Sequence, residues 1–394
     1  MFRFIHAADI HLDSPLRGLE QYEGAPKDEI RSATRRALER LVQLAIDEKV
    51  AFVLIAGDLY DGDWTDYNTG LFFNSQMTRL KEAEIPVFLI SGNHDAANRM
   101  TRSLKLPDNV VMFPHDAAAT EVLEELGVAI HGQSFATQAV TEDLSQAYPA
   151  SISGMINIGM LHTSATGREG HENYAPCTVE GLKTRGYDYW ALGHVHTREI
   201  LDESPLVIFP GNIQGRHIRE AGPKGCYLCT VGDDRTIVPE FRTLDVFRWE
   251  LASVDLSDME STDELPGAVV DRLQVCREQA DGLPLAVRVE LTGQTPIHDE
   301  LLGDRERWTN EIRSIALDAG SGAIWVEKVR IGTSRVRAET PAEPTGDDPM
   351  GELVEILGEL RKDTAAFEEY DIDFRKLPSK LPADLHQLLP ADDP

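Results

Sequence analysis

The sequence is poor in cysteine and contains no long hydrophobic run. Four cysteines among 394 residues are too few for a disulfide scaffold. No apolar stretch approaches the roughly 20 residues that a helix needs to cross a bilayer. The first residues, MFRFIHAADIHLD, include an acidic side chain and lack a basic region followed by a long apolar stretch, so they do not resemble a signal peptide. We therefore expect a cytoplasmic protein with no membrane-spanning segment.

Two of the cysteines, Cys226 and Cys229, have the CxxC spacing of some zinc sites. They lie in GCYLCTV, an apolar segment that predicts a buried strand, and no second pair of cysteines completes a four-ligand site. We interpret both as small core residues.

Basic residues are scarce as well, with 38 Lys and Arg against 67 Asp and Glu and a formal net charge of −29. Such an excess repels a polyanion at long range, which argues against broad, sequence-independent coating of nucleic acid. The charge is unevenly distributed, because the last 57 residues hold fifteen acidic and five basic side chains. About a third of the excess therefore lies in a tail that need not face a substrate.

Up to about residue 245, short apolar runs alternate with helical patterns, which is typical of a layered α/β domain. A helix is expected over 28–48, because Ile30, Leu38, Leu41, Val42 and Ala45 fall on one face. The expected strands are 2–6, 52–56, 87–90, 156–161, 189–192, 206–209, 226–231 and 236–241. In such folds ligands bind beyond the carboxyl ends of the strands.

The pattern changes near residue 246, which suggests a second, smaller α/β domain over 246–336. It consists of a strand (247–254), a helix (263–279), a strand (285–291), a helix (299–319) and a strand (323–331). Residues 337–349 are rich in Pro, Thr and acid and predict a linker. Beyond it, the segment 350–394 opens with one apolar stripe, Leu353, Ile356, Leu357 and Leu360, which predicts a short helix.

Five clusters of Asp, Asn and His follow the ends of predicted strands. They are DIH with Asp9 and His11, GDLYD with Asp58 and Asp61, GNHD with Asn93, His94 and Asp95, a lone His162, and GHVH with His194 and His196. Residues two apart on an extended chain point the same way, so the first and last clusters can each hold an ion with two side chains. The glycines in three of the clusters relieve tight turns.

These side chains have the chemistry of a metal site. Oxygen and imidazole ligands without thiolate suit manganese, iron or zinc. Two ions about 3.5–4 Å apart need a ligand between them, and Asp58 is the natural bridging carboxylate. Such a pair lowers the pKa of a bridging water, which gives a hydroxide that attacks a phosphorus atom in line. No G-x-S-x-G elbow or P-loop points to a different mechanism.

The ordered set DxH, GDxxD, GNHD, H and GHxH resembles the calcineurin-like metallophosphoesterase superfamily. Within it, the opening HAADIHLDSPLRGL resembles the SbcD-type DNA repair nucleases, the YhaO-like branch in particular. The resemblance spans about residues 1–245 and implies a four-layer αββα domain, followed by an α/β capping domain. It also implies a two-metal DNA nuclease, with manganese as the usual ion and an SbcC-like or YhaN-like coiled-coil ATPase as partner. A homodimer is left open.

The resemblance also assigns roles to residues. The first metal would be held by Asp9, His11 and His196, with Asp58 bridging. The second metal would be held by Asn93, His162 and His194. His94 would contact the scissile phosphate and assist the leaving oxygen, and Asp95 would orient His94 through a hydrogen bond. Asp61 occupies a position where some relatives carry a second substrate-contacting histidine.

Other substrate contacts are suggested by charge alone. The segment PGNIQGRHIRE offers Arg216, His217 and Arg219 to backbone phosphates, and the loop after His162 offers Arg168 and His171. Arg99, Arg102 and Lys105 follow GNHD. Each of them is as readily explained as a solvated surface charge.

Two other functions remain open. A phosphatase or small-nucleotide phosphodiesterase would share all five motifs. A non-enzymatic interaction module on a degenerate fold would be expected to have lost metal ligands, and here all seven ligand positions and the position of His94 are filled.

Overall fold

The computed structural model describes residues 1–14, 32–61, 67–97, 105–165 and 174–336. Residues 1–335 group into one compact unit. The expected linker 337–349 and the tail 350–394 lie outside the described residues. Within the described part of the chain, no helix combines the length and apolarity that crossing a bilayer requires.

The first sheet has six strands in the order β12-β11-β1-β2-β3-β4. They are β1 (Phe2–Ala7), β2 (Phe52–Ala56), β3 (Val87–Ile90), β4 (Val110–Met112), β11 (Gly225–Val231) and β12 (Ile237–Thr243). The strands β1 to β4 pair in parallel, whereas β11 runs antiparallel to both of its neighbours. Cys226 and Cys229 are buried free thiols on β11, as expected of core residues.

A second six-stranded sheet has the order β5-β6-β7-β8-β10-β9. Its strands are β5 (Ala119–Leu123), β6 (Val128–Gly132), β7 (Ile156–His162), β8 (Tyr189–Gly193), β9 (Glu199–Glu203) and β10 (Leu206–Phe209). The four inner strands are parallel, and an antiparallel strand closes each edge. Both sheets therefore have a parallel centre, whose carboxyl ends are free to carry a site.

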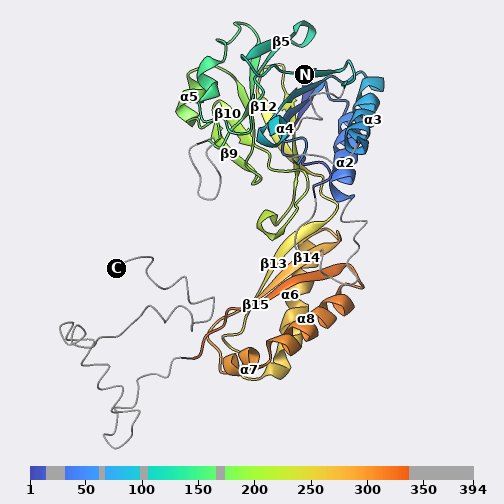
Figure 1. The fold of residues 1–394 in the computed structure, drawn as a ribbon, viewed down its shortest axis with the longest axis vertical. Helices are drawn as coiled ribbons and strands as arrows, with labels where there is room; N and C mark the ends of the chain where they lie inside the picture. The colour runs from blue at the N-terminus through green and yellow to red at the C-terminus, as the bar shows by residue number, and fades with distance from the viewer. Residues whose placement is uncertain (15–31, 62–66, 98–104, 166–173, 337–394) are drawn as a thin grey trace, which may run out of the picture. The chain divides into compact units, whose positions relative to one another are not determined.

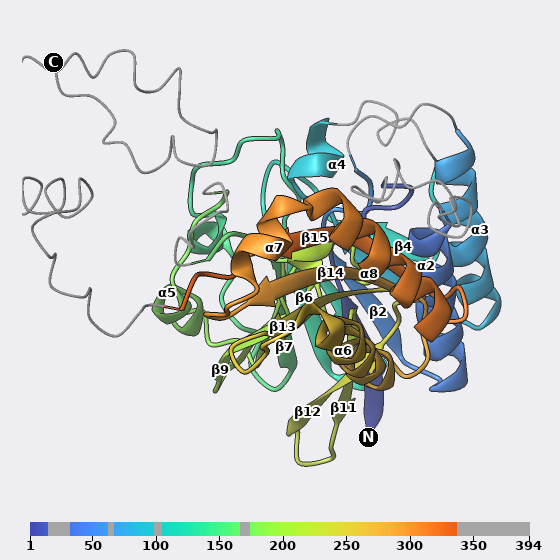
Figure 2. The ribbon, with the colours of Figure 1, turned by 90° about the horizontal axis from the view of Figure 1, so that it is seen from below.

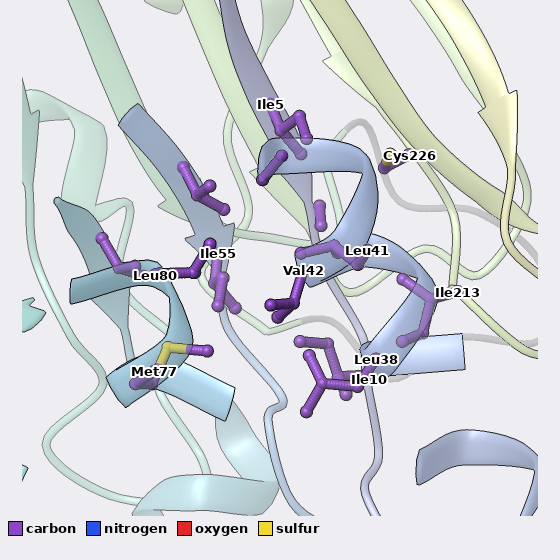
Figure 3. Close-up of a cluster of buried hydrophobic side chains, with 14 of the residues drawn as sticks. Ile5, Ile10, Leu38, Leu41, Val42, Ile55, Met77, Leu80, Ile213 and Cys226 are labelled. Atoms are coloured by element: carbon purple, nitrogen blue, oxygen red, sulfur yellow. The ribbon is translucent and has the colours of Figure 1, made fainter. Parts of the chain in front are cut away.

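The two sheets share one core, and helices pack on their outer faces. Phe4 and Phe52 of the first sheet lie in the same buried cluster as Ile130 and Ile158 of the second. On the outer face of the first sheet lie α2 (Ala33–Asp47) and α3 (Asn68–Glu82), side by side in Figure 1. Figure 3 shows the stripe of α2 turned towards β1, with Leu38, Leu41 and Val42 buried as the sequence predicts.

The outer face of the second sheet is covered by the short helix α5 (Val179–Lys183), whose Leu182 packs among Trp190 and Leu192. The arrangement is the expected αββα layering. Burying apolar side chains on both faces of each sheet explains why inner strands such as β2, β3 and β7 read as continuous apolar runs.

A third sheet consists of three parallel strands, β13 (Arg248–Asp255), β14 (Leu285–Thr292) and β15 (Ile324–Ile331), in chain order. The helices α6 (Leu265–Gln279), α7 (His298–Gly303) and α8 (Arg305–Ala319) share a core with one face of this sheet (Figure 2).

One expected helix in this region is wrong. The single helix over 299–319 is two helices, because the chain turns at Asp304, with φ −138° and ψ 60°. The side chain of Asp304 accepts a hydrogen bond from the backbone N–H of Arg307 and so caps the start of α8. The other expected strands and helices of the described residues agree with the structure to within two residues at each end, apart from the start of α2, whose expected first turn lies outside them.

Candidate metal centre

Five strands of the two central sheets end at one place and deliver the predicted side chains to it. Asp9 and His11 follow β1, Asp58 follows β2, Asn93 and His94 follow β3 on the short helix α4 (Asn93–Ala97), His162 ends β7, and His194 and His196 follow β8. All but His94 and His196 are buried. Motifs that are far apart in the sequence thus form one cluster in space.

The backbone at this cluster is held in an unusual conformation. Asp9, His11, Asp58 and His194 all have positive φ, between 45° and 102°. Residues other than glycine rarely adopt this region, and such strain collects at functional sites. Gly57, with φ 93°, also lies so close to the His162 ring that any side chain there would collide with it. Its place in the GDLYD motif is therefore a structural necessity.

The first group of ligand atoms belongs to Asp9, His11 and His196. The Nε2 atoms of the two histidines face each other at 3.0 Å, and His196 Nε2 lies 3.9 Å from Asp9 Oδ1. The backbone N–H of His194 donates to both oxygens of the Asp9 carboxylate at 3.0 Å, which holds it in place. Two imidazole nitrogens and a carboxylate thus converge on one point.

The second group belongs to Asp58, His162 and His194. His162 Nδ1–H donates to the backbone oxygen of Ala56 at 3.0 Å, so Nε2 is the ring nitrogen directed into the site. That Nε2 lies 3.0 Å from Asn93 Oδ1 and 3.5 Å from Asp58 Oδ2.

Asp58 also connects the two groups. Its Oδ2 lies 3.9 Å from His11 Nε2 of the first group, and its Oδ1 accepts the backbone N–H of His94 at 3.0 Å. The structure therefore places Asp58 where the sequence predicts a bridging carboxylate.

Burial and mutual contact perturb the protonation of these groups. Burial raises the pKa of Asp9 to about 6 and lowers that of His11 to about 3. Burial opposes ionisation of Asp58 as well, but His162, His11 and His94 around it hold its pKa below the ordinary value. In the same way Asp58 and Asp9 outweigh burial at His162 and raise its pKa to about 9. Burial thus disfavours the charged form of the carboxylates at this site, and a bound cation would offset that cost.

This donor set fits two divalent cations. The ligand atoms of each group lie within 4.8 Å of one another, and the Nε2 atoms of His11 and His196 face each other at 3.0 Å. Nitrogen and oxygen donors without thiolate suit a borderline transition ion. The structure brings together all seven predicted ligands.

His94 lies beside the cluster and is partly exposed, with 36% of its side chain accessible. Its Nδ1 lies 3.1 Å from Asp61 Oδ1, and this contact raises the pKa of His94. Asp61 also accepts a hydrogen bond from Ser14 Oγ at 2.6 Å and lies 3.7 Å from His11 Nδ1.

The predicted role of Asp95 is wrong. Its carboxylate accepts the backbone N–H groups of Leu59, Tyr60 and Gly92 at 2.9–3.1 Å and does not meet the His94 ring. Neighbouring residues on a helical turn point in different directions, so Asp95 faces the β2 loop. The residue that orients His94 is Asp61.

Of the predicted substrate contacts, one lies beside the ligand cluster, three are partly or fully exposed, and four lie outside the described residues. Arg216 lies beside the cluster, with its NH1 3.3 Å from Ser14 Oγ and 3.7 Å from Asp61 Oδ2. His217 is half-buried, with Nε2 3.4 Å from Glu220 Oε1, whereas Arg219 is exposed. Lys105 is exposed too. Arg99, Arg102, Arg168 and His171 lie outside the described residues.

Sequence analysis missed Glu220, which is buried behind the first group. Its Oε1 accepts His196 Nδ1 at 2.7 Å and Arg216 NH2 at 3.1 Å, while Oε2 accepts Asn212 Nδ2 at 2.9 Å. Burial opposes its ionisation, but His196 and Arg216 hold its pKa well below the ordinary value. A metal-binding histidine usually donates its other N–H to a carboxylate, so an acid in the PGNIQGRHIRE loop was the available signal.

Comparison with known proteins gives the family. Residues 2–198 match the model of the calcineurin-like phosphoesterases, and residues 249–334 match the middle domain of the metallophosphoesterase YhaO. A Bacillus subtilis (strain 168) protein described as an uncharacterized metallophosphoesterase, YhaO, is 38% identical over 299 residues. The match covers 74% of this chain and 72% of that relative.

Two solved structures are similar over 62% of this chain. A dimetal phosphatase from Danio rerio has a TM-score of 0.39 at 14% identity, with 96% of its own chain covered. GAP50 of Plasmodium, described as the anchor in the inner membrane complex, has a TM-score of 0.38 at 12% identity, with 84% covered. The sequence matches and the metal-binding geometry agree: this chain belongs to the calcineurin-like metallophosphoesterases and carries the YhaO middle domain.

Proposed function

We propose that this metallophosphoesterase is a two-metal DNA nuclease, with Mn²⁺ as its preferred ion. The observation that carries the proposal is a partly exposed imidazole, His94, beside two groups of candidate ligands that Asp58 connects. DNA as the substrate is supported by the resemblance of the opening HAADIHLDSPLRGL to DNA repair nucleases. The large negative charge of the chain disfavours DNA at long range, and two bound cations would offset the carboxylates at the site itself.

Asp9, His11, Asp58 and His196 would hold one divalent ion, and Asp58, Asn93, His162 and His194 the other. When bound, such a pair supplies Lewis acidity to the phosphate and a nucleophile at neutral pH. The hydrogen bonds to Asp9 and from His162 keep these ligands oriented before the substrate arrives.

His94 is placed to act on the substrate itself. Because Nδ1 is engaged by Asp61, the ring is fixed and Nε2 remains to meet the phosphate or donate a proton to the leaving oxygen. Arg216, held by Glu220, adds a positive charge on the same side of the site as Asp61.

The first test compares substrates. We expect Mn²⁺-dependent cleavage of end-labelled linear DNA, single- or double-stranded, and loss of that cleavage with EDTA, because the ligand groups cannot act without their ions. Circular DNA in parallel distinguishes endonuclease from exonuclease action. Cleavage that survives chelation and dialysis would contradict the metal mechanism.

A nucleotide monoester and a small diester, assayed beside DNA, test the second function. A phosphatase or small-nucleotide phosphodiesterase would hydrolyse these with DNA left intact, and that outcome would replace the nuclease proposal. The complete ligand set argues against a non-enzymatic module.

We further propose that residues 350–394 dock on an SbcC-like or YhaN-like coiled-coil ATPase. The support comes from the sequence: a short helix with one apolar stripe is marginal in water by itself, and it follows a predicted linker. Its acidic face disfavours DNA and suits a basic groove on a protein.

Deletion of residues 340–394 is expected to leave metal-dependent cleavage of simple DNA substrates largely intact and to abolish co-purification with the ATPase. Pull-down from cells that contain both proteins, with cleavage assayed on the same preparations, measures the two effects. If the truncated protein unfolds or loses cleavage, the segment belongs to the catalytic body instead.

A further inference from the structure

The loop after β10 joins the first ligand group to the third sheet. At one end, Glu220 of the 3-10 helix η4 (Ile218–Glu220) accepts His196 Nδ1 at 2.7 Å. Glu220 is itself fixed by Asn212 Nδ2 and by the backbone N–H of Arg216, at 2.9 and 2.7 Å. The orientation of the His196 ring therefore depends on the position of this loop.

The loop is fastened to β13 on both sides of Glu220. Trp249 Nε1–H donates to the backbone oxygen of Gly215 at 3.0 Å, and the backbone oxygen of Trp249 accepts Gly222 N–H at 2.9 Å. Gly215 has no room for a side chain, because a Cβ there would press on the backbone oxygen of Glu220 and on the Trp249 ring.

A second pair of hydrogen bonds precedes this anchor. Gln214 Nε2 donates to Phe247 O at 2.6 Å, and Gln214 Oε1 accepts Val246 N–H at 2.9 Å. Gln214 is buried, so each of these bonds is shielded from water.

Aromatic packing supports the same contact. Phe247, Trp249 and Trp325, here called the aromatic platform, are 1–6% exposed and form one buried cluster against which Ile218 of η4 packs. Trp325 belongs to β15, so two strands of the third sheet contribute to the platform. The Phe247 and Trp325 rings stack with centroids 5.7 Å apart.

The second ligand group is held differently. His162 is fixed by Ala56 O of β2, and Asn93 lies on α4 after β3. The hydrogen bonds that orient these two side chains in the described structure come from within the two six-stranded sheets and their loops.

We propose that the third sheet sets the metal affinity of the first group alone, with Trp249 as a positioning residue that acts through Gly215, Glu220 and His196. The YhaO-type middle domain then helps to position a metal ligand, in addition to burying apolar surface. Metal binding is measured without any substrate, so its outcome is independent of whether the substrate is DNA.

The test titrates Mn²⁺ into metal-stripped full-length protein by calorimetry, with electron paramagnetic resonance to distinguish coupled pairs from single ions. Trp249→Phe keeps an aromatic ring and removes the N–H to Gly215. One of the two Mn²⁺ sites should weaken by about 3- to 10-fold, the effect of one ordinary hydrogen bond, while the other keeps its affinity. The coupled signal should give way to a single-ion signal at limiting Mn²⁺.

Two further variants test whether the effect of Trp249 reaches His196 through the loop and Glu220. Glu220→Gln should weaken the same site by about 10- to 100-fold, as changes to the partner of a metal-binding histidine do. Gln214→Met removes the two hydrogen bonds of Gln214 to Phe247 and Val246 at similar side-chain volume. It should weaken the same Mn²⁺ site as much as Trp249→Phe does, so it tests the proposal if Trp249→Phe does not fold.

The matched control is Trp308→Phe. Trp308 is 2% exposed in the core that α8 forms with the far face of the same sheet, so it tests general loosening of this domain. Its Mn²⁺ binding should equal that of the unmodified protein. Equal weakening of both sites in Trp249→Phe, equal effects of Trp308→Phe and Trp249→Phe, or unchanged binding in Trp249→Phe would each overturn the proposal.

Discussion

Replacement of His94 by alanine should lower the rate of phosphoester cleavage by about 10²- to 10⁴-fold and leave two metals bound. The side chain lies beside the two ligand groups with Nδ1 at 3.1 Å from Asp61, and in the proposed function its loss removes a proton donor and a phosphate contact and leaves the seven proposed ligands in place. Single-turnover rates, with metal content measured on the same samples, test both halves of this expectation.

Asp61→Asn should reproduce part of the loss, since it weakens the contact that orients the His94 ring. His115→Ala is the matched control, because His115 is an exposed histidine away from the ligand groups, and it should leave the rate unchanged. If His94→Ala loses metal and keeps its rate per bound pair, His94 is a ligand and the assignment must be reversed.

Asp58→Ala should have the larger effect and reduce cleavage to background. Its carboxylate approaches histidines of both ligand groups, at 3.9 Å from His11 Nε2 and 3.5 Å from His162 Nε2. Without it, two cations would repel each other with no shared anion between them. We expect fewer than two metals per chain by elemental analysis, even at high Mn²⁺.

Asp202→Asn serves as the control for Asp58→Ala. Asp202 is a carboxylate of β9 that pairs with Lys183 and lies outside the ligand groups, so metal content and rate should stay as they are. Two tightly bound metals in Asp58→Ala would show that another group bridges them.

The structure also separates what local sequence encodes from what packing decides. Strand ends were predicted within two residues for β2 and β3, whose apolar runs are buried on both faces, but the equally buried strand β6 was not predicted. The polar edge strand β5 (ATEVL) and the helix α3 were not among the expected elements. β5 has no buried face to impose an alternating pattern, and the apolar face of α3 is interrupted by Thr69, Gly70 and Gln76.

The sequence by itself identified the side chains that gather at the candidate metal centre. Their residue types follow from what a borderline cation binds, and their order follows from parallel strands that all end at one edge. The residue types and the order of the motifs are properties of short segments, so they can be read from the sequence without reference to the rest of the fold.

Only the tertiary structure decided which carboxylates orient which imidazoles. Asp61 rather than Asp95 meets His94, and Glu220, 24 residues further along the chain, holds His196. Such pairings depend on the directions in which loops and helical turns present their side chains. Those directions are fixed by long-range contacts, here between the loop at Gly215 and Trp249 of the third sheet, and no local pattern specifies them.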